Sequence, residues 1–415
     1  MENYHRRAAY ASRVMHETPG LLMLEWLFWL CVIGIVYIYV LYPLVIFCLA
    51  RFFPAPVAKG KTSESCTVLI AAYNEAETLP PKIQALLESA DASLIDEILI
   101  GSDGSDDGTP DCLRDITDSR VRVISFAERR GKPSVLNDLV RQARSEALVF
   151  TDARQVIESG ALTALMENFA DPDVGVVSGE LVFYVPDRET GMTEKGLDAY
   201  WRYEKCIRRS EARFRSVPGA TGALYALRRR LFKPIPPSCV LDDVAIPMQA
   251  VMEGARCVFE ERAVVRDRPA ASPAVEARRK RRTLAGNIQL VRLYPSLILP
   301  WRNPIFFEFV SHKILRLLSP FLLLACAGAN VALGMDAWMY RITGALQGMF
   351  YLLATVGWIT ALQGKRAPGL SAFTAFVQLN GMTLLGWYDY ITGNVQVSWS
   401  RTRLSGQDRN KTRSD

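Results

Sequence analysis

The chain has 415 residues, of which 50% are hydrophobic and 22% are charged, and its net charge at pH 7 is +6. A chain of this length holds more than one hydrophobic core, and so modest a charge argues against nucleic acid as the partner. The eight cysteines form no C-x-x-C pair, which indicates neither a zinc site nor a disulfide framework and is typical of a domain that faces a reducing compartment.

A long apolar stretch follows a short amino-terminal tail, residues 1–20. Residues 21–53 are interrupted only by Glu25 and Arg51, and about 20 apolar residues suffice to cross a hydrocarbon core. The stretch is too long for the apolar part of a cleaved signal peptide, and no small-residue cleavage site follows it. We therefore predict a permanent transmembrane anchor.

Residues 60–290 have the composition of a soluble domain in which strands and helices alternate. Apolar runs at 67–72, 97–101, 121–125 and 147–151 predict strands, and each ends in a polar loop. Between the first two, apolar residues at helical spacing predict a helix. This order predicts a largely parallel α/β sheet covered by helices, whose ligand lies beyond the carboxyl ends of the strands.

Acidic or polar residues follow three of these strands, so we expect them to form one site. Asp103 and Asp152 come directly after apolar runs, and the first loop has the sequence A-Y-N-E at residues 72–75. Strand-end carboxylates accept hydrogen bonds from the base and ribose of a nucleotide, or hold a divalent cation that neutralises a diphosphate. Asp106 and Asp107 are better interpreted as turn or helix-capping residues.

A second acidic pair, Asp242 and Asp243, follows another apolar approach. Sugar transfer with inversion needs a base that deprotonates the acceptor hydroxyl, and a carboxylate beside the donor is suited to that role. Its neighbour would then cap the following helix. Trp201 and Glu204, on a predicted helix, suit a sugar acceptor, although ordinary helix packing explains them as well.

Basic side chains for the leaving diphosphate come from Lys132 and from the run RRKRR at residues 278–282. Arginine suits bidentate phosphate binding, but a basic run beside a membrane also binds anionic lipid, and the residues alone favour neither. The histidines, His5, His16 and His312, lie in the tail or the membrane parts. We therefore expect no histidine-dependent triad in the soluble domain.

Apolar blocks return near the carboxy terminus. Residues 300–312 suit an interfacial helix, or else form the first turns of the next span. Residues 313–392 predict about three transmembrane helices, the last of them weakened by Gln378, Asn380 and Asp389. Basic loops place the soluble domain on the cytoplasmic side, but after four complete spans the basic tail, residues 393–415, would lie outside. Two alternatives to a complete last span therefore stay open, namely a re-entrant segment and an interfacial one.

The ordered motifs of the chain are A-Y-N-E (72–75), S-D-G-S-D-D-G-T (102–109), G-K (131–132), T-D-A-R (151–154), T-G-A-L-Y-A-L-R-R (221–229), D-D (242–243) and R-R-K-R-R-T (278–283). Together they resemble family 2 glycosyltransferases, in particular the membrane-integrated cellulose, chitin, hyaluronan and poly-N-acetylglucosamine synthases. The resemblance covers essentially residues 22–400. It implies a Rossmann-like α/β domain of the GT-A fold, a UDP-sugar donor, inversion at the anomeric carbon and usually Mg²⁺ or Mn²⁺.

By position, the resemblance also implies a role for each motif residue. Asp152 would be the first acid of the D-x-D motif and a metal ligand, and Asp243 would be the general base. The donor would contact Ala72, Tyr73, Asn74, Glu75, Asp103, Lys132, Asp152, Arg154, Arg279 and Arg282. The acceptor would be bordered by Trp201, Glu204, Thr221, Gly222 and Asp242.

Two positions depart from the family pattern. Arg154 stands where D-x-D has its second acid, and we favour a metal held by Asp152 and the diphosphate over replacement of its charge by Arg154. Residues 279–283 keep the phosphate-binding cation, Arg282, of the Q-x-x-R-W motif of processive synthases but lack its Gln and Trp. This weakens the case for processive polymerisation.

We therefore expect a multi-pass glycosyltransferase of the inner (plasma) membrane that uses a UDP-sugar at the cytoplasmic face to build an exopolysaccharide or another envelope glycan. One alternative is transfer of a single sugar to a lipid-linked acceptor, and another is an inactive nucleotide-sugar sensor. Expected partners are the UDP-sugar donor, a glycan or lipid-linked acceptor and membrane lipids, and not nucleic acid.

Overall fold

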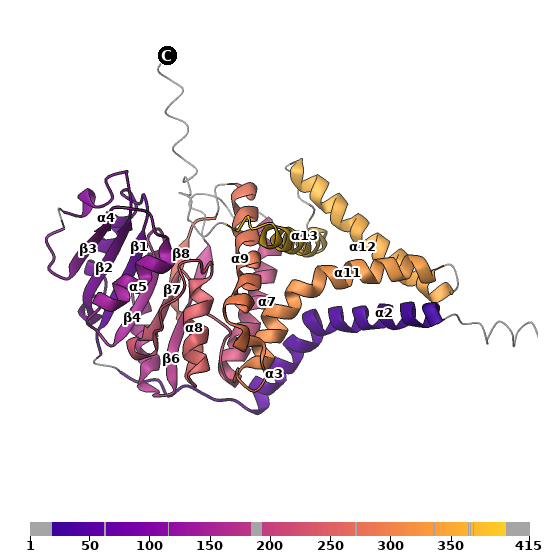
Figure 1. The fold of residues 1–415 in the computed structure, drawn as a ribbon, viewed down its shortest axis with the longest axis horizontal. Coiled ribbons are helices and arrows are strands. Elements are labelled where there is room, and N and C mark those ends of the chain that lie inside the picture. Colours follow the sequence, from indigo (N-terminus) through magenta and orange to yellow (C-terminus); the bar gives the residue numbers. More distant parts are fainter. Residues whose placement is uncertain are drawn as a thin grey trace, which may run out of the picture. The chain divides into compact units, whose positions relative to one another are not determined.

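A computed structural model describes residues 19–395 apart from 62–63, 115, 184–192, 270–271, 335–336, 364, 366 and 368, and for residues 193–200 it describes the backbone alone. The predicted tails therefore lie almost wholly outside the described residues. The chain divides into two compact units, and Figure 1 labels their elements. The first unit holds residues up to 44, 191–200 and 315–384, and the second holds 45–190, 201–314 and the residues from 385 onward.

The first unit consists of apolar helices. Its main elements are α2 (Pro19–Val36), the π-turn η1 (Tyr37–Leu41), α11 (Leu315–Leu333), α12 (Trp338–Leu362) and the larger part of α13 (Ser371–Ile391). Several polar side chains inside the unit pair with one another, as expected in an apolar surrounding. The Ser319 hydroxyl donates to Asn380 Oδ1 at 2.6 Å and accepts from the Tyr39 hydroxyl at 3.0 Å.

Three stretches of the described chain are long and apolar enough to cross a membrane, namely Gly20–Phe52, Phe306–Leu333 and Trp338–Leu362. The second begins inside residues 300–312, which were predicted as an interfacial helix or as the first turns of the next span. The choice between these two alternatives stays a prediction. Helix α13 is not among the three, and it buries Thr374, Asn380 and Thr383.

The second unit is built on an eight-stranded sheet with the order β3-β2-β1-β4-β7-β6-β8-β5. Strands β1 to β4 run parallel, β7 is antiparallel to β4 and β6, and β8 is parallel to β6. The four predicted strands are confirmed to within two residues, whereas the mixed second half was not predicted. The strands are β1 (Cys66–Ala72), β2 (Ile95–Asp103), β3 (Val121–Phe126), β4 (Ala147–Asp152), β5 (Val156–Ile157), β6 (Val174–Phe183), β7 (Leu224–Arg228) and β8 (Arg256–Asp267).

Helices cover both faces of this sheet. All seven residues of β1 are buried, and they alternate between two hydrophobic clusters, as expected for a strand that is covered on both sides. Leu69 packs with α5 (Lys132–Gln142) and α8 (Asp242–Met252), whereas Ile70 packs with α4 (Leu79–Glu88) and α6 (Ala161–Met166). The other helices are α3 (Tyr42–Phe52), α7 (Thr193–Phe214), α9 (Pro273–Leu293) and α10 (Phe306–Phe309).

The loop after β2 requires a glycine at position 104. Gly104 has a φ of +66°, and a Cβ atom there would lie 2.7 Å from the backbone nitrogen of Arg129. Its own N–H donates to the carbonyl of Phe126 at 3.1 Å. The close approach, which other residues would obstruct, joins the carboxyl end of β2 to the segment that leads into α5.

Candidate active site

The loop after β1 is fixed by the acidic loop after β2. Asn74 has a positive φ of 55°, which asparagine tolerates better than most residues. Its side-chain amide donates to Asp106 Oδ1 at 2.7 Å and accepts from the Asp106 N–H at 3.0 Å. Asp107 accepts from the backbone N–H of Ala76 and Thr109. Asp106 and Asp107 therefore have the turn roles predicted for them.

The other residues of the first loop lie at the same edge of the sheet. Ala72 is the buried last residue of β1. The ring of Tyr73 is covered by the Arg129 guanidinium, whose central carbon lies 3.8 Å from the ring centroid. Glu75 accepts a hydrogen bond of 2.5 Å from the Thr78 hydroxyl at the start of α4. Contact of these residues with a donor stays a prediction.

Asp103 holds the loop before α5. The residue is 1% exposed, and its two carboxylate oxygens accept from the backbone N–H of Arg130 at 2.7 Å and of Gly131 at 2.8 Å. Since Lys132 follows directly, the carboxylate helps to set where α5 begins. The predicted contact between Asp103 and a nucleotide base would come in addition to this structural role.

Lys132, the first residue of α5, links the two acidic motifs. Its ammonium lies 2.8 Å from Asp152 Oδ1 and 3.1 Å from Asp242 Oδ2. Burial alone lowers the pKa of Lys132, but the charges of Asp152, Asp242 and Asp243 outweigh it and raise the pKa above its ordinary value. In return, Lys132 holds the pKa of Asp152 below its usual value although burial raises it. Both groups are therefore charged at neutral pH.

A second lysine, which sequence reasoning missed, supports the loop after β4. The Lys82 ammonium is buried and donates to the Thr151 hydroxyl at 3.0 Å and to the Gln155 carbonyl at 2.7 Å. Burial lowers the pKa of Lys82 to about 7, against the charges of Asp152 and Asp267, which raise it. The sequence did indicate this role, because Lys82 lies among the apolar residues of the predicted helix and a lysine buried there needs a polar partner.

Arg154 is engaged with a carboxylate that was not predicted. Its Nη2 lies 2.8 Å from Asp267 Oδ2, at the carboxyl end of β8. The amide of Gln155 donates to the same oxygen at 3.2 Å. Asp267 ends a strand, as Asp103 and Asp152 do, so the signal that found those two acids would have found it had β8 been predicted.

Asp243 lies against the backbone of Gly222. A Cβ atom at position 222 would come within 2.9 Å of Asp243 Oδ2, so glycine leaves room for that carboxylate. Burial and the neighbouring Asp242 raise the pKa of Asp243 to about 6, with Lys132 acting in the opposite direction. Asp242, at the first position of α8, is the more buried of the pair and contacts Lys132.

The segment that carries Gly222 is fixed by an arginine of α7. Arg208 donates to the Thr221 hydroxyl at 2.9 Å and to the Ser178 hydroxyl at 2.7 Å. The Thr221 N–H donates to the same Ser178 oxygen at 2.9 Å. The predicted acceptor residue Thr221 is thereby held beside Asp243. Sequence reasoning did not single out Arg208 or Ser178.

His312 corrects the expectation about histidines. Its two ring nitrogens lie 2.7 Å from Glu211 Oε1 and 3.0 Å from Glu204 Oε2. The residue therefore packs on α7 within the catalytic unit and does not belong to the membrane helices alone. Glu204, predicted to border the acceptor, is paired with this imidazole. Trp201, 41% exposed, packs on Phe183 with ring centroids 5.7 Å apart.

The basic side chains of α9 contact two different parts of the protein. Arg281 forms a two-point ion pair with Asp389 of α13, at 2.9 and 2.5 Å. Arg282 reaches toward the Val240 carbonyl, two residues before Asp242, at 3.5 Å. Burial and the neighbouring charge of Arg154 lower the pKa of Arg279, which also interacts with Asp267 and Asp152. Arg279 and Arg282 thus lie near the predicted site residues, whereas Arg281 pairs with α13, and contact of Arg279 or Arg282 with a donor stays a prediction.

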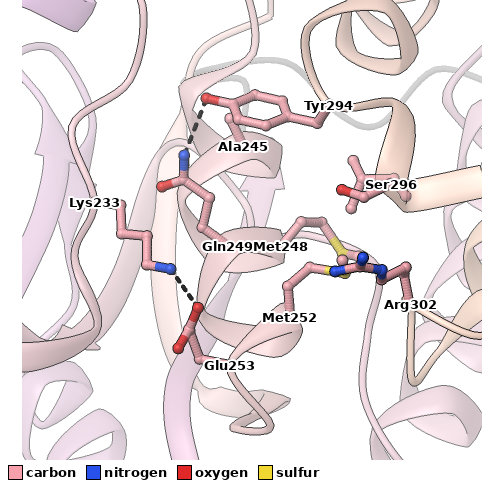
Figure 2. A pocket seen from close by; sticks show the side chains of 10 residues that line it. Lys233, Ala245, Met248, Gln249, Met252, Glu253, Tyr294, Ser296 and Arg302 are labelled. Carbon is pink, nitrogen blue, oxygen red and sulfur yellow. Dashed lines mark hydrogen bonds and ion pairs between the residues drawn. The ribbon is translucent and has the colours of Figure 1, made fainter.

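A cavity of about 360 Å³ lies beside α8 (Figure 2), on the side of the helix that faces away from Asp243. At 100° per residue, its lining residues Ala245, Met248 and Met252 project away from Asp243. The lining carboxylate, Glu253, is paired with Lys233, and Gln249 donates to the Tyr294 hydroxyl at 3.0 Å. The cavity contains none of the predicted site residues.

A divalent cation was expected at Asp152. Among the described residues, no group of three or more His, Cys, Asp or Glu side chains is arranged to hold one. Mg²⁺ in nucleotide sites is usually bound by one or two carboxylates together with substrate phosphates and water. The residues present therefore fit a cation held largely by the substrate, with Asp152 as a protein ligand.

Comparisons with known proteins show which family and which fold the chain resembles. Residues 67–235 match the family model of glycosyl transferase family 2. The chain is 25% identical over 202 residues to a poly-β-1,6-N-acetyl-D-glucosamine synthase of Staphylococcus aureus strain COL, covering 48% of each protein. The match to that enzyme of Staphylococcus epidermidis is 24% over 206 residues. The chain thus spans about half the length of the curated relatives it matches.

A solved structure covers much more of the chain. It is a mannosyltransferase of Pyrobaculum calidifontis in complex with GDP-Man and Mn²⁺, and it superimposes with a TM-score of 0.67 at 21% identity. The match covers 89% of this chain and 99% of the other. At this identity the similarity establishes the fold, which is GT-A.

The Lys132 contacts generate a prediction about stability. Replacing Lys132 by Met leaves the buried Asp242 and the half-buried Asp152 without their cation, so we expect a loss of about 3 kcal/mol in the free energy of unfolding. Thermal unfolding of the purified protein in detergent measures it. Lys280→Met is the control, because Lys280 pairs on the surface with Glu276 at 3.7 Å and should change little. Equal behaviour of the two variants would contradict the structural role of Lys132.

Proposed function

Because residues 67–235 match the family model of glycosyl transferase family 2, we propose that this chain transfers a sugar from a UDP-sugar to an acceptor hydroxyl with inversion at the anomeric carbon. The observation that supports this most strongly is the network that joins Asp152, Lys132 and Asp242 beside Asp243. It puts a carboxylate for the donor, a cation for the diphosphate and a candidate base into one site.

Asp243 is proposed as the general base. With a pKa of about 6, its carboxylate is ionised at pH 7 yet basic enough to take a proton from a hydroxyl, which is the compromise that general-base catalysis favours. The proton moves to a carboxylate oxygen while the acceptor oxygen bonds to the anomeric carbon. The bond from that carbon to the diphosphate breaks, and UDP leaves.

The departing diphosphate gains negative charge, which the basic residues of the site stabilise. Lys132 is held in place by two carboxylates, and Arg279 and Arg282 approach from α9. Preorganised cations of this kind stabilise developing charge without reorganising. A bound Mg²⁺ or Mn²⁺ would add Lewis-acid stabilisation of the same charge, with Asp152 among its ligands.

The proposed product is an exopolysaccharide or another envelope glycan made at the cytoplasmic face of a membrane. The similarity to poly-N-acetylglucosamine synthases supports the polysaccharide. With three spans, residues beyond Leu362 lie on the side of the catalytic domain, and the Arg281–Asp389 ion pair supports this. Helix α13 would then be interfacial and the basic tail cytoplasmic, as the positive-inside rule favours.

A second candidate is the addition of one sugar to a lipid-linked acceptor. It is favoured by the absence of the Gln and Trp of the Q-x-x-R-W motif at residues 279–283. In this reading the site releases its product after each transfer.

The proposed base can be tested with donor turnover. A screen of several UDP-sugars on purified protein should find one that is hydrolysed or transferred, and Asp243→Asn should reduce that rate by 10²-fold or more because the base is lost. Since the base acts deprotonated, kcat/KM should fall about tenfold per pH unit below about pH 6. A fully active Asp243→Asn enzyme would refute the assignment, and Asp111→Asn, at an exposed acid, serves as the control that should keep its activity.

Gly222→Ala tests the position of that base. The added methyl group would push against Asp243 Oδ2, which is the free end of a side chain and can move. We expect thermal stability to fall little while kcat falls by about tenfold to a hundredfold, because a 1 Å misplacement of a catalytic group can cost about 10²-fold. Gly348→Ala is the control, since this glycine lies in helix α12 and nothing lies within 4 Å of a Cβ atom at that position. Unchanged kcat in Gly222→Ala would contradict this geometry.

Product length separates the two candidates. Membranes incubated with the radiolabelled donor found in the screen should yield a high-mass polymer if the enzyme is a polysaccharide synthase. A single lipid-soluble product of fixed size would instead establish transfer to a lipid-linked acceptor. Asp243→Asn membranes supply the blank for both assays.

A further inference from the structure

We propose that Asp267 supplies the second metal-binding carboxylate that the D-x-D position lacks, so that a divalent cation is held by Asp152, Asp267 and Gln155 when the donor is present. The inference deepens the proposed function, from which it takes the diphosphate of the donor. The two carboxylates lie at the ends of two different strands. Asp152 ends β4, and Asp267 ends β8.

The amide of Gln155 lies between these two carboxylates. Its Nε2 is 3.5 Å from Asp152 Oδ2 and 3.2 Å from Asp267 Oδ2. Both oxygens therefore face the same small space, which a hydrogen-bond donor occupies here. A cation in that space would satisfy the same two oxygens more strongly than a neutral amide does.

The side-chain amide of Gln155 also carries an oxygen that can bind a cation. Gln155 is 2% exposed, and its Oε1 has no hydrogen-bond partner among the described residues. A buried polar atom without a partner costs about 1–3 kcal/mol, so such atoms are rare and call for an explanation. Side-chain amide oxygens are ligands for hard divalent cations. With a half-turn of its terminal amide, Gln155 would direct Oε1 at the space between the carboxylates.

The loop that carries Asp152 and Gln155 is held in place by Lys82. Lys82 donates to the backbone carbonyl of Gln155 at 2.7 Å and to the Thr151 hydroxyl at 3.0 Å. These two contacts fix the backbone of the loop from which the side chains of Asp152 and Gln155 project. Support of this kind fixes the orientation of metal ligands.

Arg154 occupies the carboxylate that the cation would need. Its guanidinium pairs with Asp267 at 2.8 Å, and 26% of the side chain is exposed, so it can turn outward. A donor diphosphate brings two negative charges, and a divalent cation brings two positive ones. Arrival of both leaves the charge balance of the site unchanged, with Arg154 moving from Asp267 to the diphosphate.

Manganese binding tests this assignment independently of turnover. The full chain, purified in detergent with UDP, is titrated with Mn²⁺, and the electron paramagnetic resonance signal of free Mn²⁺ gives the affinity. We expect Asp267→Asn to weaken Mn²⁺ binding by tenfold or more. Arg154→Asp, which restores the second acid of D-x-D, should strengthen it and provides a test even if Asp267→Asn fails to fold. Asp111→Asn, at an exposed acid, is the matched control and should bind as the wild type does.

Two results would overturn the assignment. One is that Asp267→Asn binds Mn²⁺ like the wild type while Asp152→Asn does not, which would leave Asp267 outside the site. The other is that the wild type turns over the donor but binds no Mn²⁺ with UDP, which would remove the metal and keep the proposed function. Mn²⁺ and UDP binding that depend on Asp267 in a protein with no turnover would support the site and contradict the proposed function instead.

Discussion

The ammonium of Lys132 between Asp152 and Asp242 is the interaction on which the rest of the site depends. Three loops from distant parts of the chain bring acidic groups to one edge of the sheet, and like charges so close together repel one another. A lysine at the start of α5 makes that arrangement tolerable because it contacts two of the carboxylates. The same charge keeps Asp152 ionised and limits how far the pKa of Asp243 rises.

The backbone around this lysine is arranged to hold it there. Asp103 accepts two backbone hydrogen bonds directly before Lys132, and Gly104 allows the loops after β2 and β3 to approach each other. Gly222 gives Asp243 its space, and Arg208 fixes the neighbouring Thr221. The aspartates therefore fall into two groups: Asp103, Asp106 and Asp107 shape the loops, and Asp152, Asp242 and Asp243 lie together at Lys132, where we propose the chemistry takes place.

Features that depend on the local sequence pattern were predicted, whereas features that depend on contacts between residues distant in the sequence were not. The strands β1 to β4 are apolar runs that end in polar loops, so their bounds and strand-end acids were readable. Strand β8, RCVFEERAVVRD, carries charged residues along its length, which hid both the strand and Asp267. His312 sits in an apolar segment, and nothing local shows that it pairs with Glu204 and Glu211 about a hundred residues away. The pairing of Arg281 with Asp389 was hidden for the same reason.

We propose that the carboxyl ends of β1, β2 and β4 form the nucleotide-sugar site, with Lys132 at the diphosphate. A cryo-electron microscopy structure of the full chain with UDP and Mn²⁺ would locate the nucleotide. We expect diphosphate density in contact with Lys132 and beside Asp152, with the uridine against the loop at residues 73–75. Nucleotide density in the cavity behind α8, or anywhere away from Lys132, would contradict it.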